Sequence, residues 1–352
     1  HGVTCPDNNT FYQADNTPMG AWANAANAAM LSEAFRISGH SALMEEYRDS
    51  AIVAYNYAET LSNQMLDSSF TAGLRGRDLK MTAAAFLYNV TGDTEYENVI
   101  HEESLVTGPT SDFIRKDLYN QLYAMAAYLH TPRTVNYPDL RENMIAAAVH
   151  QARLREAGYS QTRPSRRSAD GDYGWFHTEQ QVQRTILAHS VATDPEDKSF
   201  LEDALILEAD WSLGRNSANL VQMTTATTAL DTLRSIQQCY TSGWDDGSPG
   251  VHPGHTPYMN IYDWGSGMIM SRPSWMTDKG YPAISEWPKS EAYFDVRYVY
   301  AHCEFTPAQT MRGKQALYGY LTSIGESSGE EVPVTGVTFT ESEVTVEGSE
   351  DL

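Results

Sequence analysis

The chain has 352 residues, of which 41% are hydrophobic, and a formal net charge of −22. This length is enough for one large domain or two small ones, and the apolar share is enough for a sizeable core. The acidity argues against a nucleic acid partner, whose phosphates the chain would repel. The sequence contains no run of 18 or more apolar residues, which argues against a membrane span. These properties suit a secreted protein that acts on a neutral polymer.

The three cysteines, Cys5, Cys239 and Cys303, are too few for a disulfide framework and lack the spacing of a metal site. At most one disulfide bond can form, and the sequence does not say between which two. Cys303 directly precedes Glu304. We expect a buried, unreactive thiol there, because a nucleophile would need a base partner that cannot be identified.

The polar residues 1–17 predict a loop, after which the pattern turns helical. Alanine-rich segments with apolar residues at steps of three and four predict helices over residues 19–37 and 42–61. Gly39 fits the C-cap of the first helix, and Ser41 fits the N-cap of the second. The two segments therefore predict a helical hairpin.

The hairpin pattern recurs along the chain. Further helix pairs are expected at residues 80–90 and 95–104, at 113–130 and 140–157, and at 179–192 and 199–213. A Thr-rich helical run to about residue 238 and a last helix at 306–321 are also expected. A repeat of helical hairpins roughly 45–50 residues long indicates a solenoid or a closed toroid. The sequence therefore predicts an all-α fold.

Two long loops interrupt this pattern. Residues 157–180 are polar, and residues 240–291 are rich in Gly and Pro and carry four tryptophans. A structureless stretch as long as the second is usually functional. Its His252 and His255 have a spacing that zinc sites use, but no third ligand stands out, so we predict no metal site.

The densest group of reactive side chains lies between residues 293 and 309. It holds two carboxylates, Asp295 and Glu304, with Arg297 and Tyr300 between them. Hydrolysis of a glycosidic bond uses such groups, because one carboxylic acid protonates the leaving oxygen, a second carboxylate activates water and aromatic faces hold the sugar. The alternative is that Asp295 caps a helix and pairs with Arg297 while Glu304 lies on a solvated turn.

The spacing Y-x-D-x-x-x-x-Y-x-x-x-E that ends at Glu304 resembles the C-terminal active-site signature of glycoside hydrolase family 9, the inverting β-1,4-glucanases. Residues 211–216, WSLGRN, resemble that family's late Leu-Gly-Arg-Asn motif. The resemblance implies that Glu304 is the general acid and that Asp295 assists at the catalytic site. The chain departs from the signature at Thr310 and Met311, where the family has an Asn and a small residue.

The family's catalytic domains are (α/α)6 toroids of six helical hairpins, so the resemblance implies this fold for residues 1–325. The expected helices are fewer than such a toroid contains. This implies that the N-terminal helices, with the family's Asp-Ala-Gly-Asp base motif, lie before residue 1. Residues 326–332 predict a linker, and residues 333–352 alternate as a strand does. We expect this short β segment to begin a bacterial immunoglobulin-like module.

The catalytic base has a second set of candidates if it lies within the chain. These are Asp170, Asp172, Asp245 and Asp246. The segment ADGDYG at 169–174 is similar to the base motif but comes several helices too late. The resemblance also implies a sugar-contacting histidine, His252 or His255, and further substrate-binding residues Tyr258, Trp264, Arg297 and Tyr300. Family members often carry a structural calcium. No ligand cluster at calcium-loop spacing is present in the sequence, and no other cofactor is expected.

The resemblance implies a secreted, extracellular enzyme that cleaves β-1,4-glucan with inversion. Its partners would be the polysaccharide substrate and an upstream fragment of the same polypeptide. A second hypothesis is an extracellular carbohydrate-binding or structural protein that retains the toroid and lacks the base. A polysaccharide lyase is disfavoured, because it needs Lys or Arg to neutralise uronic acids and the chain carries a charge of −22.

Overall fold

A computed structural model describes residues 17–64, 77–115, 119–168, 178–216, 218–224, 234–237 and 315–325, and a few single residues elsewhere, among them Asp295. The helices are α1 (Pro18–Ser38), α2 (Ser41–Gln64), α3 (Arg77–Thr91), α4 (Thr94–Glu103), α5 (Leu122–Leu129), α6 (Pro138–Leu154), α7 (Glu156–Thr162), α8 (Thr178–Val191), α9 (Pro195–Ser212) and α13 (Ala316–Ile324). The predicted all-α class is confirmed. The linker and β segment predicted at 326–352 lie outside the described residues.

Local side chains fix the ends of the first helix. Thr17 accepts a hydrogen bond from the backbone N–H of Gly20 at 3.2 Å, and Pro18 occupies the first turn. At the other end Gly39 adopts a left-handed conformation with φ 81°, which glycine takes without a steric penalty. The predicted hairpin and its Gly39 C-cap are therefore confirmed, whereas the predicted N-cap is wrong by one residue, because α2 already includes Ser41.

The prediction of a helix at 113–130 is wrong in its first half. Strand β1 (Ile114–Arg115) pairs antiparallel with β2 (Tyr119–Asn120), and α5 begins at Leu122. The side chains of Asp112 and Asn120 accept backbone N–H bonds from the residues two positions on, Ile114 and Leu122. Such local bonds compete with a helix for the same donors.

The helical run predicted after Asn216 is also wrong where the structure describes it. Strand β3 (Leu220–Val221) pairs with β4 (Arg234–Ser235) in parallel. The run is rich in threonine, whose branched β-carbon favours strands over helices.

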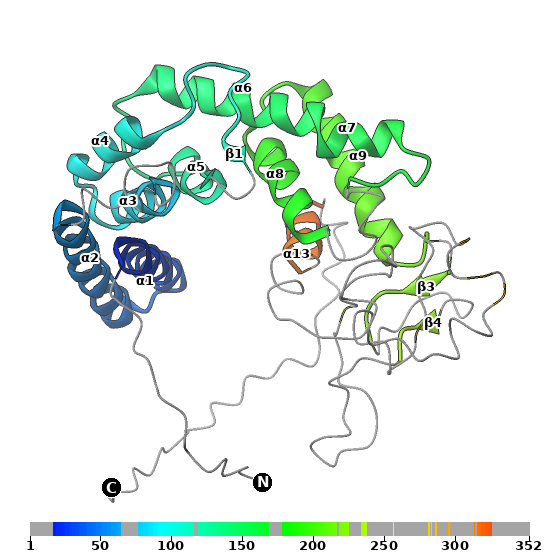
Figure 1. Ribbon diagram of the computed structural model, residues 1–352, viewed down its shortest axis with the longest axis horizontal. Coiled ribbons are helices and arrows are strands. Elements are labelled where there is room, and N and C mark those ends of the chain that lie inside the picture. Colours follow the sequence, from blue (N-terminus) through cyan, green and yellow to red (C-terminus); the bar gives the residue numbers. More distant parts are fainter. Residues whose placement is uncertain are drawn as a thin grey trace, which may run out of the picture.

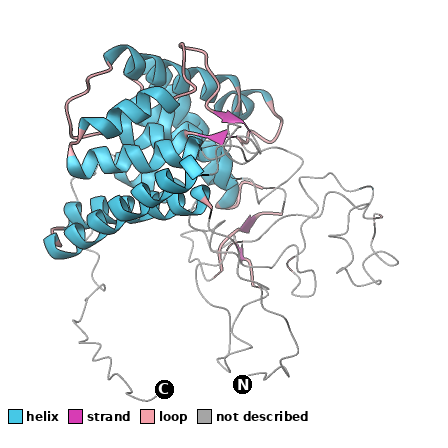
Figure 2. Cartoon of the chain, turned by 60° about the vertical axis from the view of Figure 1, so that its left-hand side comes forward, coloured by secondary structure: helices cyan, strands magenta, loops and turns pink. Residues whose placement is uncertain are grey.

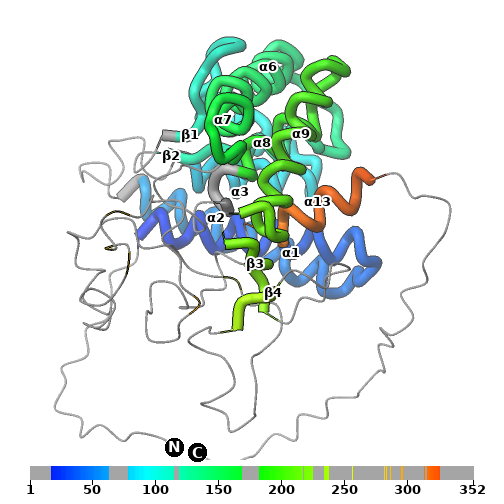
Figure 3. Tube along the Cα trace, turned by 90° about the vertical axis from the view of Figure 1, so that its right-hand side faces the viewer, coloured from blue at the N-terminus to red at the C-terminus, as the bar shows by residue number. Residues whose placement is uncertain are grey.

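The helices form an arc of two rows (Figure 1). The inner row consists of α1, α3, α5, α8 and α13, and each of these packs against the next. The outer row consists of α2, α4, α6 and α9. The α1–α2 hairpin lies at one end of the arc, and α13 lies at the other, against α8 and α9 (Figure 3).

Small side chains let the inner helices approach one another closely. The core is rich in alanine, and Ala25, Ala29, Ala84, Ala85 and Ala124 are fully buried. The distance between two packed helices depends on the side chains at their contact. The alanine-rich pattern of the sequence thus corresponds to the inner row.

The connections differ sharply between the two ends of this arc. Each inner helix leads to its outer partner through a short turn, at residues 39–40, 92–93, 130–137 and 192–194. Each outer helix leads on through a longer stretch, at residues 65–76, 104–121, 155–177, which includes α7, and 213–315, of which the structure describes only part. We call these the short-turn end and the long-loop end. Both strand pairs belong to the long-loop end (Figure 2).

Candidate functional site

The residues that the sequence assigned to the site lie in two connections between helices. All of them belong to the connection between α9 and α13, or, for two candidate bases, to the connection between α6 and α8. Binding and catalytic residues concentrate on loops that a rigid scaffold positions. The candidate site is therefore this end of the helical arc.

Asp295 is the one predicted site residue that the structure describes. It is partly buried, and its Oδ2 accepts a hydrogen bond from the backbone N–H of Gln237 at 2.9 Å. The other predicted residues lie outside the described part of the chain. They are Glu304, His252, His255, Tyr258, Trp264, Arg297 and Tyr300, and the candidate bases Asp170, Asp172, Asp245 and Asp246.

The hydrogen bond from Gln237 connects Asp295 to the helical scaffold. Ile236, just before Gln237, is fully buried and donates its N–H to the carbonyl of Val221 at 3.1 Å. Gln222, just after Val221, donates its N–H to the carbonyl of Ser212 at 2.8 Å. A short series of backbone bonds thus runs from the end of α9 through β3 and β4 to the Asp295 carboxylate.

The WSLGRN motif shapes the turn that starts this series. The Asn216 side-chain amide donates to the carbonyls of Trp211 and Leu220, at 2.8 and 2.7 Å. Its oxygen accepts from the N–H groups of Ala218 and Leu220, each at 3.2 Å. Asn216 therefore bonds to four backbone groups where α9 ends. These bonds hold β3 against the end of α9, so the motif has a structural role among the described residues.

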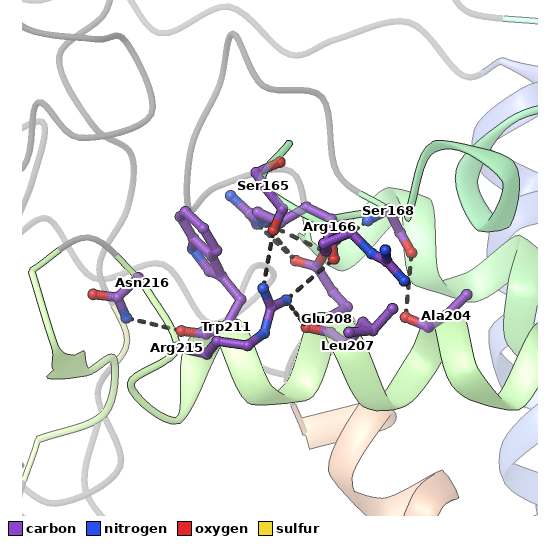
Figure 4. A network of polar contacts seen from close by, with 10 residues as sticks. Ser165, Arg166, Ser168, Ala204, Leu207, Glu208, Trp211, Arg215 and Asn216 are labelled. Atoms are coloured by element: carbon purple, nitrogen blue, oxygen red, sulfur yellow. Dashed lines mark hydrogen bonds and ion pairs between the residues drawn. The ribbon is translucent and has the colours of Figure 1, made fainter. Parts of the chain in front are cut away.

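A buried ion pair supports the same corner of the molecule (Figure 4). Arg167 Nη2 lies 2.6 Å from Glu208 Oε1, and both side chains are almost completely buried. The backbone N–H of Ser168 also donates to Glu208, at 3.0 Å. A buried charge pair is tolerated only where further hydrogen bonds satisfy it. The pair fixes residues 167–168 to the C-terminal part of α9.

Arg215 belongs to the same network (Figure 4). Its guanidinium donates to the carbonyls of Ser165, Arg166 and Leu207 at 2.6–3.1 Å. The Arg167 and Arg215 guanidinium carbons lie 4.8 and 5.9 Å from the centre of the Trp211 ring, within the range of a cation–π contact. Burial lowers the pKa of Arg215.

A second buried ion pair lies at the boundary between α6 and α7. Arg184 Nη1 donates to both carboxylate oxygens of Glu156, at 2.8 and 3.1 Å. Burial raises the pKa of Glu156, and the Arg184 guanidinium acts in the opposite direction. The pair joins α7 to α8 at the long-loop end.

A third polar group joins the first four helices at this end. Lys80 Nζ lies 3.2 Å from Glu59 and 3.7 Å from Glu103, and Trp22 Nε1 donates to Glu59 at 3.2 Å. These side chains come from α1, α2, α3 and α4. Sequence reasoning missed all three ionic groups. Their members lie between 21 and 41 positions apart in the chain, and no spacing rule predicts such a contact.

Helix α13 fixes the chain on the far side of the predicted acid. Leu317 is fully buried, and Tyr320 Oη lies 2.7 Å from His189 Nδ1 on α8. Burial lowers the pKa of His189 and raises that of Tyr320 to about 12. Asp295 and α13, the described parts of the chain before and after Glu304, are therefore both bonded to other described parts of the structure.

The described residues contain no group of three or more His, Cys, Asp or Glu arranged to hold a metal ion. The predicted structural calcium stays a prediction. None of the helices in the described ranges is long and apolar enough to cross a membrane.

No family model matches the chain, and no curated protein matches it either. Solved structures do resemble its fold. A single-mutant thermostable endoglucanase from Alicyclobacillus acidocaldarius superposes with a TM-score of 0.66 at 16% sequence identity, over 90% of this chain and 57% of that one. A family 9 glycoside hydrolase from Bacteroides ovatus gives 0.63 at 17% identity, over 91% and 56%.

An endoglucanase from the termite Nasutitermes takasagoensis gives a TM-score of 0.57 at 16% identity, over 91% of this chain and 70% of that one. Another similar structure, with a TM-score of 0.65, holds a cellobiose-like isofagomine. The chain has the fold of the family 9 endoglucanases and spans just over half the length of the first structures that it matches.

Proposed function

With the family 9 endoglucanase fold as the premise, we propose that this chain hydrolyses β-1,4-glucan with inversion at the anomeric carbon. One observation carries the proposal. Asp295, in the signature that the sequence shares with the family, is bonded to the scaffold at the long-loop end through the N–H of Gln237. The net charge of −22 suits a secreted protein that acts on a neutral polymer. No step of this reaction needs a cofactor.

In this proposal Glu304 is the general acid. Its carboxylic acid protonates the glycosidic oxygen as the bond to the anomeric carbon breaks, which supplies a neutral leaving group. A carboxylate on the opposite face of the sugar removes a proton from the attacking water. For inversion the two carboxyl groups stand about 6.5–9.5 Å apart, which leaves room for that water.

The water-activating carboxylate is proposed to come from polypeptide upstream of residue 1. The in-chain candidates are Asp170, Asp172, Asp245 and Asp246. Tyr258, Trp264 and Tyr300 would stack on sugar rings, and Arg297 with His252 or His255 would bond to sugar hydroxyls. A structural calcium is proposed only as a stabilising ion.

In this mechanism Asp295 positions the stretch of chain that carries Glu304. Its carboxylate accepts a backbone N–H bond, which leads through β4 and β3 to α9. An acid placed 1 Å from its productive position can lose about two orders of magnitude in rate. We infer that Asp295 fixes where the acid-bearing stretch starts and does not itself transfer a proton.

The test is the release of reducing sugar from soluble β-glucan and amorphous cellulose. Glu304→Gln is expected to lower kcat by about 10²–10⁴-fold, because the leaving oxygen loses its proton donor. Glu46→Gln, on the exposed face of α2, is the matched control and should leave kcat unchanged. NMR of the first product should show the α-anomer. An initial β-anomer would contradict inversion.

The second hypothesis, a carbohydrate-binding protein without catalysis, is favoured by the missing base motif. It predicts that the unmodified chain binds β-glucan in affinity electrophoresis yet releases no sugar, and that Glu304→Gln binds equally well. Measured turnover that depends on Glu304 would exclude this hypothesis.

A further inference from the structure

Helix α13 is attached to the other described helices by a small number of side chains. It runs only from Ala316 to Ile324, and a helix of this length is not stable in water by itself. Its one fully buried side chain is Leu317, which packs against Val182 on α8 and Leu205 on α9. The docking of α13 therefore depends on each further contact that it makes.

A tyrosine–histidine pair supplies such a contact. Tyr320 Oη lies 2.7 Å from Nδ1 of His189 on α8, and the two rings meet edge to face with their centres 5.7 Å apart. His189 is only 8% exposed, so little water competes for this hydrogen bond. A buried polar group that loses its partner costs more than an exposed one, because water does not replace the bond.

The other ring nitrogen of His189 indicates where the hydrogen of the neutral imidazole lies. Nε2 is 3.8 Å from the Glu202 carboxylate on α9, which favours the hydrogen on Nε2 and leaves the lone pair on Nδ1. One nitrogen of a neutral imidazole donates and the other accepts, so Nδ1 accepts the hydrogen bond from the Tyr320 hydroxyl. Burial raises the pKa of Tyr320 to about 12, so this hydroxyl keeps its hydrogen at neutral and acid pH.

Protonation of His189 removes the lone pair on which this bond depends. Nδ1 then faces the Tyr320 O–H as a second donor, and the hydroxyl must turn away. The new charge also lies among α8, α9 and α13, and this burial lowers the pKa of His189. Two charged groups face the ring from α9, of which Glu202 favours the imidazolium and Lys198 opposes it. The Glu202 side chain is 46% exposed, so water screens its attraction.

The charged and titratable groups of α5, α6 and α7 bond to other positions of α8. His130, at the end of α5, has its Nε2 2.9 Å from Oγ of Ser190. Burial and the Arg141 guanidinium of α6 lower the pKa of His130. On the α7 side Glu156 pairs with Arg184, more than one turn before His189. His130 is therefore a second candidate for any effect of pH on the packing of α8.

We propose that the bond between His189 and Tyr320 is a proton-sensitive latch that docks α13 at neutral pH and releases it in acid. The released helix leaves His189 in water, where its pKa returns to the ordinary value of 6.5. Because the docked state has the lower pKa, it binds fewer protons than the released state. Docking is thus fully stabilised above pH 6.5 and is weakened progressively as the pH falls below that value.

The latch has a consequence for catalysis that rests on the proposed function. Ala316, the first residue of α13, follows Glu304 by twelve positions on the same segment of chain. Release of α13 removes one of the described attachments of that segment. We expect the proposed acid to be positioned less well in acid solution, so kcat should fall as the latch opens.

Hydrogen exchange tests the latch without any turnover. The protection of the α13 amides is compared with that of the α3 amides in the same sample of the full chain, at about pH 7.5 and about pH 5. The ratio of the two protection factors cancels the effect of pH on intrinsic exchange. We expect the relative protection of α13 to fall about fivefold in acid, as for the loss of one hydrogen bond. An unchanged ratio would overturn the proposal.

Three variants separate the latch from other effects of pH. His189→Asn places an amide oxygen that does not titrate near the position of Nδ1 and should keep α13 protected at both pH values. Tyr320→Phe removes the hydroxyl and should leave α13 weakly protected at both, which decides the matter if His189→Asn does not fold. His150→Asn, at a partly exposed histidine of α6, is the matched control and should keep the fivefold step. A step that survives His189→Asn and disappears in His130→Asn would contradict the latch.

Steady-state kinetics on soluble β-glucan over the same pH range test the consequence for catalysis. In acid, kcat should fall more steeply in the unmodified chain than in His189→Asn, with the same KM in both. Identical pH profiles of kcat would overturn the link between the latch and the Glu304 segment. Absence of turnover at every pH would refute the proposed hydrolysis instead, and the exchange experiment alone would then decide the latch.

Discussion

The short-turn end and the long-loop end of the helical arc are built by different kinds of interaction. At the short-turn end, Asp93 and Asp194 accept hydrogen bonds from the first N–H groups of α4 and α9, and Gly39 and Gly92 take left-handed conformations. At the long-loop end, the connections depend on Arg167–Glu208, Arg184–Glu156 and the β3–β4 pair. The short-turn end combines these local caps with long-range bonds, such as those from Arg133 to the carbonyls of Asn89 and Val90, whereas the two buried charge pairs belong to the long-loop end.

From this difference we infer different roles for the two ends. Short turns with local caps leave little room for variation, so that end fixes how the helices stack. Long loops held by distant partners can change in sequence while the scaffold stays the same, and such loops are where binding and catalysis are usually found. Four substitutions test the comparison.

The largest effect is expected where the long-loop end has its most buried charge pair. Arg167→Ala leaves the Glu208 carboxylate buried without its guanidinium, which should lower the free energy of unfolding by about 3–5 kcal/mol. Urea unfolding measures this change. Arg48→Ala, which removes an exposed pair with Asp49, should cost less than about 1 kcal/mol. Equal costs for the two substitutions would mean that the buried pair does not hold this end.

Asp295 should affect catalysis more than stability. Asp295→Ala removes the acceptor for the Gln237 N–H and is expected to lower kcat by roughly 10²-fold through misplacement of the acid-bearing stretch. Asp295→Asn keeps an oxygen that can accept the same bond and should retain most of kcat, with KM unchanged. If Asn is as damaging as Ala, the carboxylate has a direct chemical role, and the positioning account is wrong. Steady-state kinetics on soluble β-glucan decide this.

Gly158 tests the junction of α6 and α7 at the long-loop end. A β-carbon there would lie 2.2 Å from the carbonyl oxygen of Arg153, so Gly158→Ala must move the backbone. We expect a loss of about 1–3 kcal/mol in the free energy of unfolding, as for other overpacked sites. Gly319→Ala is the matched control, because a β-carbon at that position in α13 meets nothing within 4 Å. It should be neutral or slightly stabilising.

The smallest effect is expected at the short-turn end. Asp194 accepts hydrogen bonds from the N–H groups of Glu196 and Asp197 at 2.8 and 3.1 Å. Asp194→Ala should cost about 1 kcal/mol, and Asp194→Asn only a few tenths, because Asn caps a helix nearly as well. Thermal melting of the two variants measures the difference. A loss above that of Gly158→Ala would reverse the proposed contrast between the ends.

The helices at the short-turn end could be predicted from the sequence because their signals are local. Gly39, Asp93 and Asp194 act on backbone groups within a few residues, and the observed helix ends lie close to the expected ones. The same reasoning was wrong for residues 113–121, where the side chains of Asp112 and Asn120 take the donors that a helix would use.

The candidate site was predictable only as a pattern of residues. The spacing from Asp295 to Glu304 pointed to glycosidase chemistry, and the structure adds the bond that holds Asp295. The supporting pairs Arg167–Glu208 and Arg184–Glu156 gave no sequence signal, because a charge looks the same in sequence whether it lies in water or in an interior.

The sequence by itself determined the helical class and the hairpin repeat, since periodicity and capping act over a few residues. Only the tertiary structure decided which helices form the inner row and which end receives the longer connections. Those features depend on contacts between residues tens of positions apart, and the free energy of such contacts comes from burial that exists only once the helices have packed.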